Sequence, residues 1–215
     1  MTDLKLQLRA QLDTMAHMQE GHNQEINADW RNAGYPYYRA IWVECAELLD
    51  HFGWKWWKLQ PGDLDQVRLE LVDIWHFGLS DLLRESVDLD TLTDALAELS
   101  VPDQPEPEAF RLAVERLAFA TLEQRRFVLP EFLEAMRQLP MSAQQLFDLY
   151  VGKNVLNSFR QRNGYRSGTY LKNWGGREDN EHLVELLGEL NCAPADVPER
   201  LSAELDARYR LHRPA

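Results

Sequence analysis

Two pairs of acidic residues, each with a spacing of three, constrain the fold of this chain more than any other feature. Glu44 and Glu47 form the first pair, and Glu70 and Asp73 form the second. Residues three apart lie on the same side of an α-helix, so each pair predicts two carboxylates on one helix face. Two such helices packed side by side would bring four carboxylates together.

Apolar residues around both pairs indicate that the acidic faces are turned toward a helix interface. These residues are Ile41, Val43, Leu48 and Leu49 in the first stretch and Val67, Leu71, Ile74 and Leu82 in the second. A buried carboxylate without a partner is unstable or takes up a proton, and several together repel one another. We therefore predict a divalent cation, and all-oxygen ligands favour Mg²⁺ or Mn²⁺ over zinc or copper. The alternative is a solvated acidic face paired with lysine and arginine.

Helical periodicity recurs along the chain and predicts an all-α fold. An apolar stripe near the N-terminus continues into the polar residues Gln19 and Asn23. Further helices are expected at residues 37–52, 64–83, 88–99, 106–125, 129–139, 142–162, 182–190 and 198–210. Gly53 is a helix stop and Asp63 a helix cap. Residues 163–180 contain four glycines and should be irregular, and no convincing alternating strand pattern occurs.

The length of 215 residues is enough for a single domain with a proper core. We expect one domain over residues 1–215. The proline-rich stretch VPDQPEPE is a candidate boundary of an inserted helical pair at about residues 88–140.

The chain carries 23 basic and 35 acidic residues, a formal charge of −12. This balance argues against nucleic-acid binding and against docking on anionic lipid. The two cysteines, Cys45 and Cys192, form neither a disulfide framework nor a zinc spacing. No membrane-length apolar run and no signal-peptide pattern occur in the sequence, so the expected location is the cytoplasm.

A row of basic and amide residues suited to binding a polyphosphate lies in the last third of the chain. Lys153, Asn157 and Arg160 share one helix face and precede a glycine-rich segment. That segment also contains Asn163, Gly164, Tyr165, Gly168, Tyr170 and Lys172. Arginine can grip two phosphate oxygens, and glycine lets backbone N–H groups approach. The alternative is a basic last helical turn that offsets the helix dipole.

Amides and aromatic rings form a third set with the composition of a base-binding site. It comprises Gln19, Asn23, Trp54, Trp56, Trp57, His76 and Phe77. Amides can read the edge of a base while an aromatic ring stacks on its face. The alternative places the tryptophans in the core and makes His76 a satisfied interior residue.

With these residues the chain resembles the dimeric all-α dUTPases, within the all-α nucleoside triphosphate pyrophosphatase superfamily. The superfamily pattern, Glu-x-x-Glu followed by Glu-x-x-Asp, matches Glu44 with Glu47 and Glu70 with Asp73. Three longer stretches sharpen the resemblance: VECAELLDHFGWKWWK, ELVDIWHF and GKNVLNSFRQRNGYRSGTYLKNWGGREDN. The resemblance covers residues 19–180 and is least informative between 89 and 139. It implies a helical bundle of the all-α NTP pyrophosphatase type with a C-terminal glycine-rich phosphate-binding segment.

The resemblance also implies roles for individual residues. Glu44, Glu47, Glu70 and Asp73 would hold Mg²⁺, with Glu47 also activating the attacking water. Gln19, Asn23 and Trp54 would recognise uracil, with His76 nearby and Phe77 on the sugar. The phosphates would be held by Lys58, Lys153, Asn157, Arg160, Tyr165 and Lys172. Asp179 and Asn180 match a family motif to which no definite role is given.

The implied activity is hydrolysis of dUTP, and also of dUDP, to dUMP by a cytoplasmic homodimer. The resemblance places the attack at the β-phosphorus. Such a reaction keeps uracil out of DNA and supplies dUMP for thymidylate synthesis. Two alternatives stay open: a related pyrophosphatase that acts on dCTP or modified nucleotides, and a helical interaction protein without catalytic activity.

Overall fold

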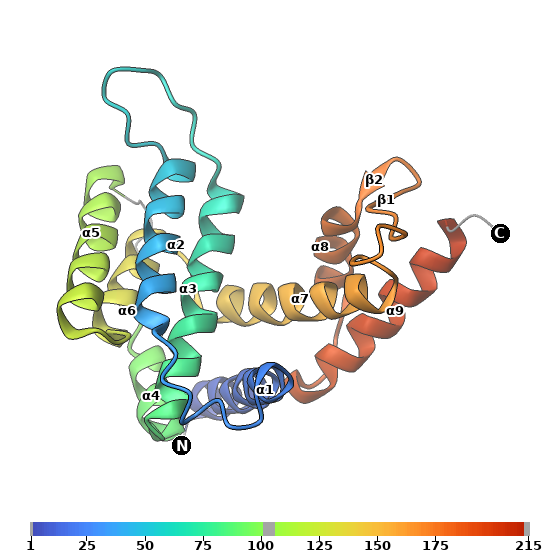
Figure 1. The fold of residues 1–215 in the computed structure, drawn as a ribbon, viewed down its shortest axis with the longest axis horizontal. Coiled ribbons are helices and arrows are strands. Elements are labelled where there is room, and N and C mark those ends of the chain that lie inside the picture. The colour runs from blue at the N-terminus through green and yellow to red at the C-terminus, as the bar shows by residue number, and fades with distance from the viewer. Residues whose placement is uncertain (1, 101–105, 213–215) are drawn as a thin grey trace. The chain divides into compact units, whose positions relative to one another are not determined.

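The computed structural model describes residues 2–100 and 106–212, which are mostly helical (Figure 1). The elements are α1 (Asp3–Ile26), α2 (Tyr37–Phe52), α3 (Leu64–Arg84), α4 (Leu89–Ala97), α5 (Pro107–Gln124), α6 (Leu129–Gln138), α7 (Ala143–Arg162), β1 (Asn173–Trp174), β2 (Arg177–Glu178), α8 (Asp179–Glu189), a 3₁₀ turn (Pro194–Asp196) and α9 (Val197–His212). The predicted all-α class is confirmed. None of the described helices has the length and hydropathy needed to span a membrane.

The chain forms two compact units, Met1–Leu146 and Phe147–Ala215. Most of the proline-rich stretch predicted as a boundary lies outside the described residues, and the inserted helical pair stays a prediction.

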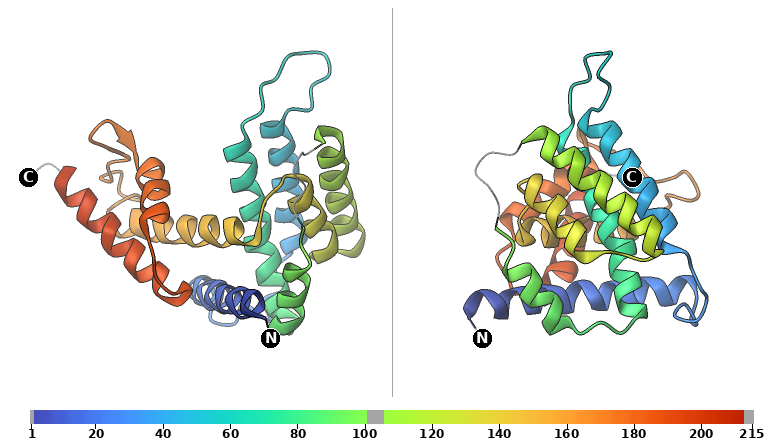
Figure 2. Two further views of the ribbon diagram at one scale, coloured as in Figure 1. Left: turned by 180° about the vertical axis from the view of Figure 1, so that it is seen from behind. Right: turned by 90° about the vertical axis from the view of Figure 1, so that its left-hand side faces the viewer.

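In the first unit, α2 and α3 run side by side in opposite directions (Figures 1 and 2). Their interface is made by residues from the predicted apolar faces, because Ile41 and Leu48 of α2 and Leu71 and Ile74 of α3 are fully buried. Of the other predicted apolar residues, Val43 is exposed and Leu49 and Leu82 are partly buried. The packing of these two helices therefore places the residues between the apolar positions, including the acidic ones, at or beside the same interface.

Local signals fix where these two helices end and begin. Gly53 ends α2 with a φ of 93°, a left-handed conformation that glycine adopts without strain. The connection of residues 53–63 then projects beyond the helix ends (Figure 2). Asp63 caps α3, because its carboxylate accepts a hydrogen bond from the N–H of Gln66 at 3.1 Å. These signals explain why the predicted bounds of 37–52 and 64–83 are close to those observed.

The other helices of the first unit complete its core. α1 packs against α3 and α4, while α5 packs against α2 and α6. At the end of α3, the buried Asp81 accepts a hydrogen bond from the backbone N–H of Phe127 at 2.8 Å. This bond ties α3 to the turn between α5 and α6, next to the rings of Trp75, Phe127 and Phe132.

The second unit is built on an aromatic core. Phe159 of α7, Trp174 of β1 and Tyr209 of α9 are buried and lie with their ring centroids 5.1 to 5.6 Å apart. The prediction of an irregular segment over residues 163–180 needs a correction, because β1 and β2 pair there as an antiparallel hairpin. Gly175 and Gly176 form its turn, both with positive φ, as a two-residue hairpin turn requires. Two paired residues per strand are too few to show an alternating pattern.

α8 also begins earlier than the predicted residue 182. Glu178 and Glu181 form a capping box at its start, in which the backbone N–H of Glu178 donates to the carboxylate of Glu181 at 2.8 Å. This cap stabilises a helix that starts at Asp179. Asn180 is therefore helical, whereas the sequence placed it in the irregular segment.

Candidate active site

Three of the four predicted metal ligands form one cluster between α2 and α3. Glu44, Glu47 and Glu70 each offer a carboxylate oxygen, and these oxygens lie within 4.8 Å of one another. Glu70 is buried, Glu44 is half-buried and Glu47 is exposed. The cluster follows from the spacing of three within each pair and from the side-by-side packing of the two helices. A donor set of this kind suits a hard divalent cation.

Asp73 contributes to the electrostatics of the same cluster. Burial, followed by the negative charge of Asp73, a hydrogen bond with Glu70 and the charges of Glu47 and Glu70, raises the pKa of Glu44 from 4.5 to about 8. Carboxylates that raise one another's pKa in this way are stabilised when a cation joins them. The four acidic residues therefore fit a divalent metal, both in the type of donor and in the charge that they concentrate.

His51 is a neighbour of this cluster that the sequence did not single out. Its Nε2 atom lies 3.6 Å from Oε1 of Glu70. His51 follows Glu47 by four residues on α2, so the two share a helix face. That spacing is the signal that could have added it to the predicted set.

The predicted base-reading amides lie in a buried polar cluster between α1 and α3. Gln19 and Asn23 are 3% and 4% exposed, and the Gln19 side chain donates to the Asn23 carbonyl oxygen at 3.2 Å. Nδ1 of His76 lies 3.1 Å from Oε1 of Gln19. The structure thus brings these three predicted residues together, as expected from the packing of α1 on α3.

Ser80 joins this cluster and was missed by sequence reasoning. Ser80 is 1% exposed, and its hydroxyl accepts hydrogen bonds from Gln19 Nε2 at 2.9 Å and Asn23 Nδ2 at 3.0 Å. The hydroxyl of Tyr37 also bonds to Ser80, although burial outweighs that bond and raises the pKa of Tyr37. Ser80 lies four residues after His76 on the same helix. That spacing was the available signal.

The tryptophan segment is exposed, so its predicted alternative as part of the core is wrong. Trp56 is 89% exposed, and Trp54 and Trp57 are about half exposed. The Trp54 indole N–H donates to the carboxylate of Asp50 at 3.1 Å, and its ring meets that of Trp57 edge to face at 5.2 Å. Lys58, a predicted phosphate ligand, is exposed in the same loop. Phe77 is only partly buried on α3.

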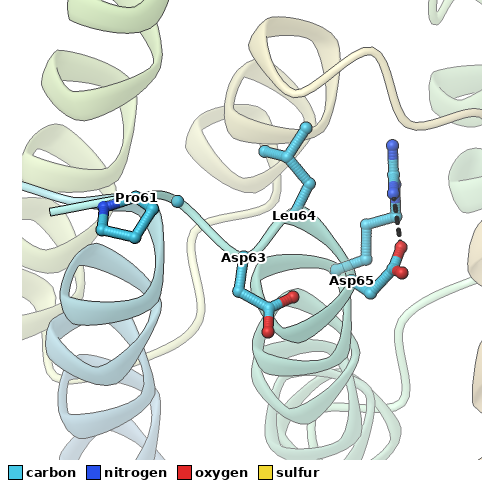
Figure 3. Close-up of a pocket in the computed structure, with 6 residues that line it drawn as sticks. Pro61, Asp63, Leu64 and Asp65 are labelled. Atoms are coloured by element: carbon cyan, nitrogen blue, oxygen red, sulfur yellow. Dashed lines mark hydrogen bonds and ion pairs between the residues drawn. The ribbon is translucent and has the colours of Figure 1, made fainter.

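A pocket lies at the N-terminal end of α3 (Figure 3). It is lined by Pro61, Gly62, Asp63, Leu64, Asp65 and Arg68. Arg68 pairs with Asp65 at 3.0 Å, and Asp63 is already used as the helix cap. None of the predicted site residues lines this pocket, and its polar groups are used in the cap and first turn of α3.

Among the predicted phosphate ligands of the second unit, Arg160 has the best defined surroundings. Its Nε and Nη2 atoms donate to the two oxygens of Asp179, both at 2.8 Å. Asp179 is fully buried and also accepts from the Tyr170 hydroxyl at 2.7 Å. Burial opposes ionisation of Asp179, but the hydrogen bonds from Arg160 and Tyr170 outweigh it and lower the pKa of the carboxylate. Asp179, for which the sequence gave no definite role, is thus the main partner of Arg160.

The remaining predicted phosphate ligands of this unit lie on its surface or are partly buried. Lys172 pairs with Glu178 at 3.0 Å, with both side chains about half exposed. Tyr165 is exposed beside Tyr170, and Asn157 is exposed on α7. Lys153 is partly buried on the same helix. The prediction that these residues bind phosphate is not tested by their positions alone.

Comparison with known proteins identifies the family that these features suggest. A family model described as dUTPase matches residues 11–165, which is more than half of the chain. The matched region contains the carboxylate cluster, the amide cluster, the tryptophan segment and Arg160, and it ends before Tyr170 and Asp179. A search of curated protein sequences found no match.

Proposed function

The chain belongs to the dUTPase family and is a dUTP diphosphatase, and from this premise we propose that it is a Mg²⁺-dependent enzyme that converts dUTP to dUMP and pyrophosphate. The observation that carries the proposal is the cluster of Glu44, Glu47 and Glu70 between α2 and α3. Enzymes of this family generally depend on a divalent metal. Acceptance of dUDP is part of the proposal, with phosphate as the second product.

We assign the metal to Glu44, Glu47, Glu70 and Asp73, with Mn²⁺ as a possible substitute for Mg²⁺. When bound, the cation would neutralise phosphate oxygens and lower the pKa of a water molecule. Glu47 is the most exposed carboxylate of the cluster, so it suits the role of general base that accepts the proton of the attacking water. Glu44 and Glu70 are held more rigidly by burial and suit the role of ligands.

Uracil recognition is assigned to Gln19, Asn23, Trp54, His76 and Phe77. The amides and His76 already form one hydrogen-bonded cluster, which supports a shared role. Trp54 offers an exposed ring for stacking, and Phe77 would pack on the sugar.

Phosphate binding is assigned to Lys58, Lys153, Asn157, Arg160, Tyr165 and Lys172. One edge of the Arg160 guanidinium, formed by Nε and Nη2, is held by the two oxygens of Asp179. This arrangement supports a guanidinium that is oriented by Asp179 and offers Nη1 to a phosphate. The proposed biological role is to keep uracil out of DNA and to supply dUMP, and the proposed assembly is a homodimer.

The decisive experiment measures release of pyrophosphate from dUTP with and without Mg²⁺, beside dCTP, dTTP and UTP. The Glu47→Gln variant tests the proposed base, and Asp65→Asn is the matched control. Asp65 is an exposed carboxylate on α3 whose partner is Arg68, outside the cluster. We expect turnover of dUTP that requires Mg²⁺, is lost in Glu47→Gln and is retained in Asp65→Asn.

Two outcomes would contradict this assignment. Equal turnover of dUTP and dCTP would move the enzyme to the broader class of pyrophosphatases that remove unwanted nucleotides. Full activity of Glu47→Gln would exclude Glu47 as the base.

A further inference from the structure

The hydroxyl of Ser80 is the centre of the amide cluster between α1 and α3. It is buried and lies within hydrogen-bond distance of Gln19, Asn23 and the backbone carbonyl of His76. A serine hydroxyl has one hydrogen to donate and two lone pairs to accept with. These contacts are enough to use the whole of this capacity, and Oδ1 of Asn23 and the Tyr37 hydroxyl lie against the same oxygen.

The direction of each hydrogen bond follows from that count. Gln19 Nε2 and Asn23 Nδ2 donate to Ser80 Oγ at 2.9 and 3.0 Å, so both lone pairs are used. The single hydroxyl hydrogen then has two acceptors, the carbonyl oxygen of His76 at 3.0 Å, one helical turn back, and Oδ1 of Asn23 at 3.3 Å. Neither acceptor belongs to Gln19, so Ser80 meets the Gln19 amide through its nitrogen, whereas both ends of the Asn23 amide lie within reach of the hydroxyl.

The consequence for Gln19 is a fixed hydrogen-bonding character. One hydrogen of its Nε2 goes to Ser80, and the other goes to Oδ1 of Asn23 at 3.2 Å. Its Oε1 faces Nδ1 of His76 at 3.1 Å, so Nδ1 carries the proton of the imidazole. With both amide hydrogens committed, Gln19 can meet a ligand only as an acceptor.

An acceptor discriminates between uracil and cytosine. On its pairing edge uracil has one donor, the N3–H, between two carbonyl oxygens, whereas cytosine has an unprotonated N3 beside its amino group. An amide that can only accept binds uracil at N3–H and meets the lone pair of N3 in cytosine at the same position. Mismatches of this kind disfavour the wrong base because a polar group is left unpaired or facing a like group.

We propose that Ser80 is a specificity-determining positioning residue, which holds the Gln19 amide in the orientation that accepts uracil and rejects cytosine. The inference rests on the proposed role of Gln19 in reading the base. Without the hydroxyl, one hydrogen of the Gln19 amide would lose its acceptor and the amide could turn over. A turned amide presents N–H where uracil also presents N–H, and it favours cytosine.

The test compares kcat/KM for dUTP and dCTP in the wild type, Ser80→Ala, Ser80→Thr and Gln19→Ala. We expect the ratio of dUTP to dCTP to fall about tenfold or more in Ser80→Ala, the scale of one misread base contact. Ser80→Thr keeps the hydroxyl and should restore most of the ratio. A role in folding alone would lower activity toward both nucleotides and leave their ratio unchanged.

The matched control is Thr93→Val. Thr93 is also buried, and its hydroxyl donates to the carbonyl oxygen one turn back, at Leu89, at 2.8 Å. Removing this hydroxyl from α4 should leave the ratio as in the wild type. If Ser80→Ala does not fold, Ser80→Cys replaces it, because a thiol of similar size accepts hydrogen bonds only weakly.

The outcomes separate this inference from the proposed function beneath it. A lower ratio in both Gln19→Ala and Ser80→Ala supports both. A lower ratio in Gln19→Ala alone overturns the role of Ser80 and keeps Gln19 as a base reader. An unchanged ratio in Gln19→Ala shows that the base is read elsewhere, and it overturns both.

Discussion

Replacing Asp179 by alanine should destabilise the second unit strongly. The Asp179 carboxylate is fully buried and accepts four hydrogen bonds: from Arg160 Nε and Nη2 at 2.8 Å, from the Tyr170 hydroxyl at 2.7 Å and from the Asn180 N–H at 2.9 Å. Removing one partner of a buried ion pair costs ~3–5 kcal/mol, because the other charge is left without compensation. The Arg160 side chain keeps 17% of its exposure, so water can compensate part of that charge. The expected loss is therefore at the lower end, ~3 kcal/mol.

Hydrogen–deuterium exchange measures this loss where it should occur. Peptides from residues 147–212 report the free energy of opening of the second unit, while peptides from the first unit serve as an internal reference. The matched control is Tyr170→Phe, which removes one hydrogen bond from the same carboxylate and leaves the ion pair intact. Its expected cost is ~1 kcal/mol. If Asp179→Ala costs no more than Tyr170→Phe, the ion pair is not what stabilises this unit, and the reasoning is refuted.

Three further predictions concern the metal cluster, pH and two glycines. The pKa of Glu44 is raised to about 8, so its charge adds to the repulsion within the cluster only at higher pH. Above pH 8, Glu44→Gln should therefore raise the melting temperature of the metal-free protein, and it should reduce the stabilisation by added Mg²⁺; Asp65→Asn should do neither. The pKa of Asp179 is lowered in the folded state, so the contribution of its ionised carboxylate to the free energy of unfolding is fully present above the unfolded pKa of 3.8. That contribution is lost as the pH falls through the lower folded pKa. Asp179→Asn should therefore lose less stability than the wild type when both are titrated with acid over that range. Gly62→Ala should lower the melting temperature, because the new Cβ would lie 2.9 Å from the Phe52 carbonyl oxygen. Gly21→Ala, in open space within α1, should instead stabilise the protein by ~0.5–1 kcal/mol. Equal shifts in the melting temperatures of these two variants would contradict the steric argument.

The sequence predicted the carboxylate cluster because its signals are local. Each acidic pair lies within one helical turn, and the helix bounds are set by neighbouring residues such as Gly53 and Asp63. Only one further inference was needed, that α2 packs on α3. The helical spacing of apolar residues such as Ile41 and Leu71, both buried, predicted this packing. For this reason the helix predicted from near Tyr37 to about Phe52 agrees with the observed α2.

The missed features depend on contacts between residues far apart in the chain. Ser80 meets Asn23 and Gln19 across 57 and 61 positions, and a serine within a helix carries no signal of such partners. Arg160 and Asp179 are 19 positions apart and are joined through a hairpin too short to show a strand pattern. Periodicity identifies which face of a helix is buried, but it does not identify which polar groups meet there.

The geometry of the Arg160–Asp179 pair is compatible with both its structural contacts and the proposed phosphate role of Arg160. A guanidinium has five N–H donors in a fixed plane, so Asp179 can hold the edge formed by Nε and Nη2 while Nη1 points elsewhere. The pair carries no net charge, so the proposed phosphate role of Arg160 also needs a further cation; Lys153 and Lys172 are the candidates, of which Lys172 is itself paired with Glu178. In the proposed role, Arg160 would orient a phosphate rather than add net charge, and the fully buried Asp179 carboxylate would hold the guanidinium in place.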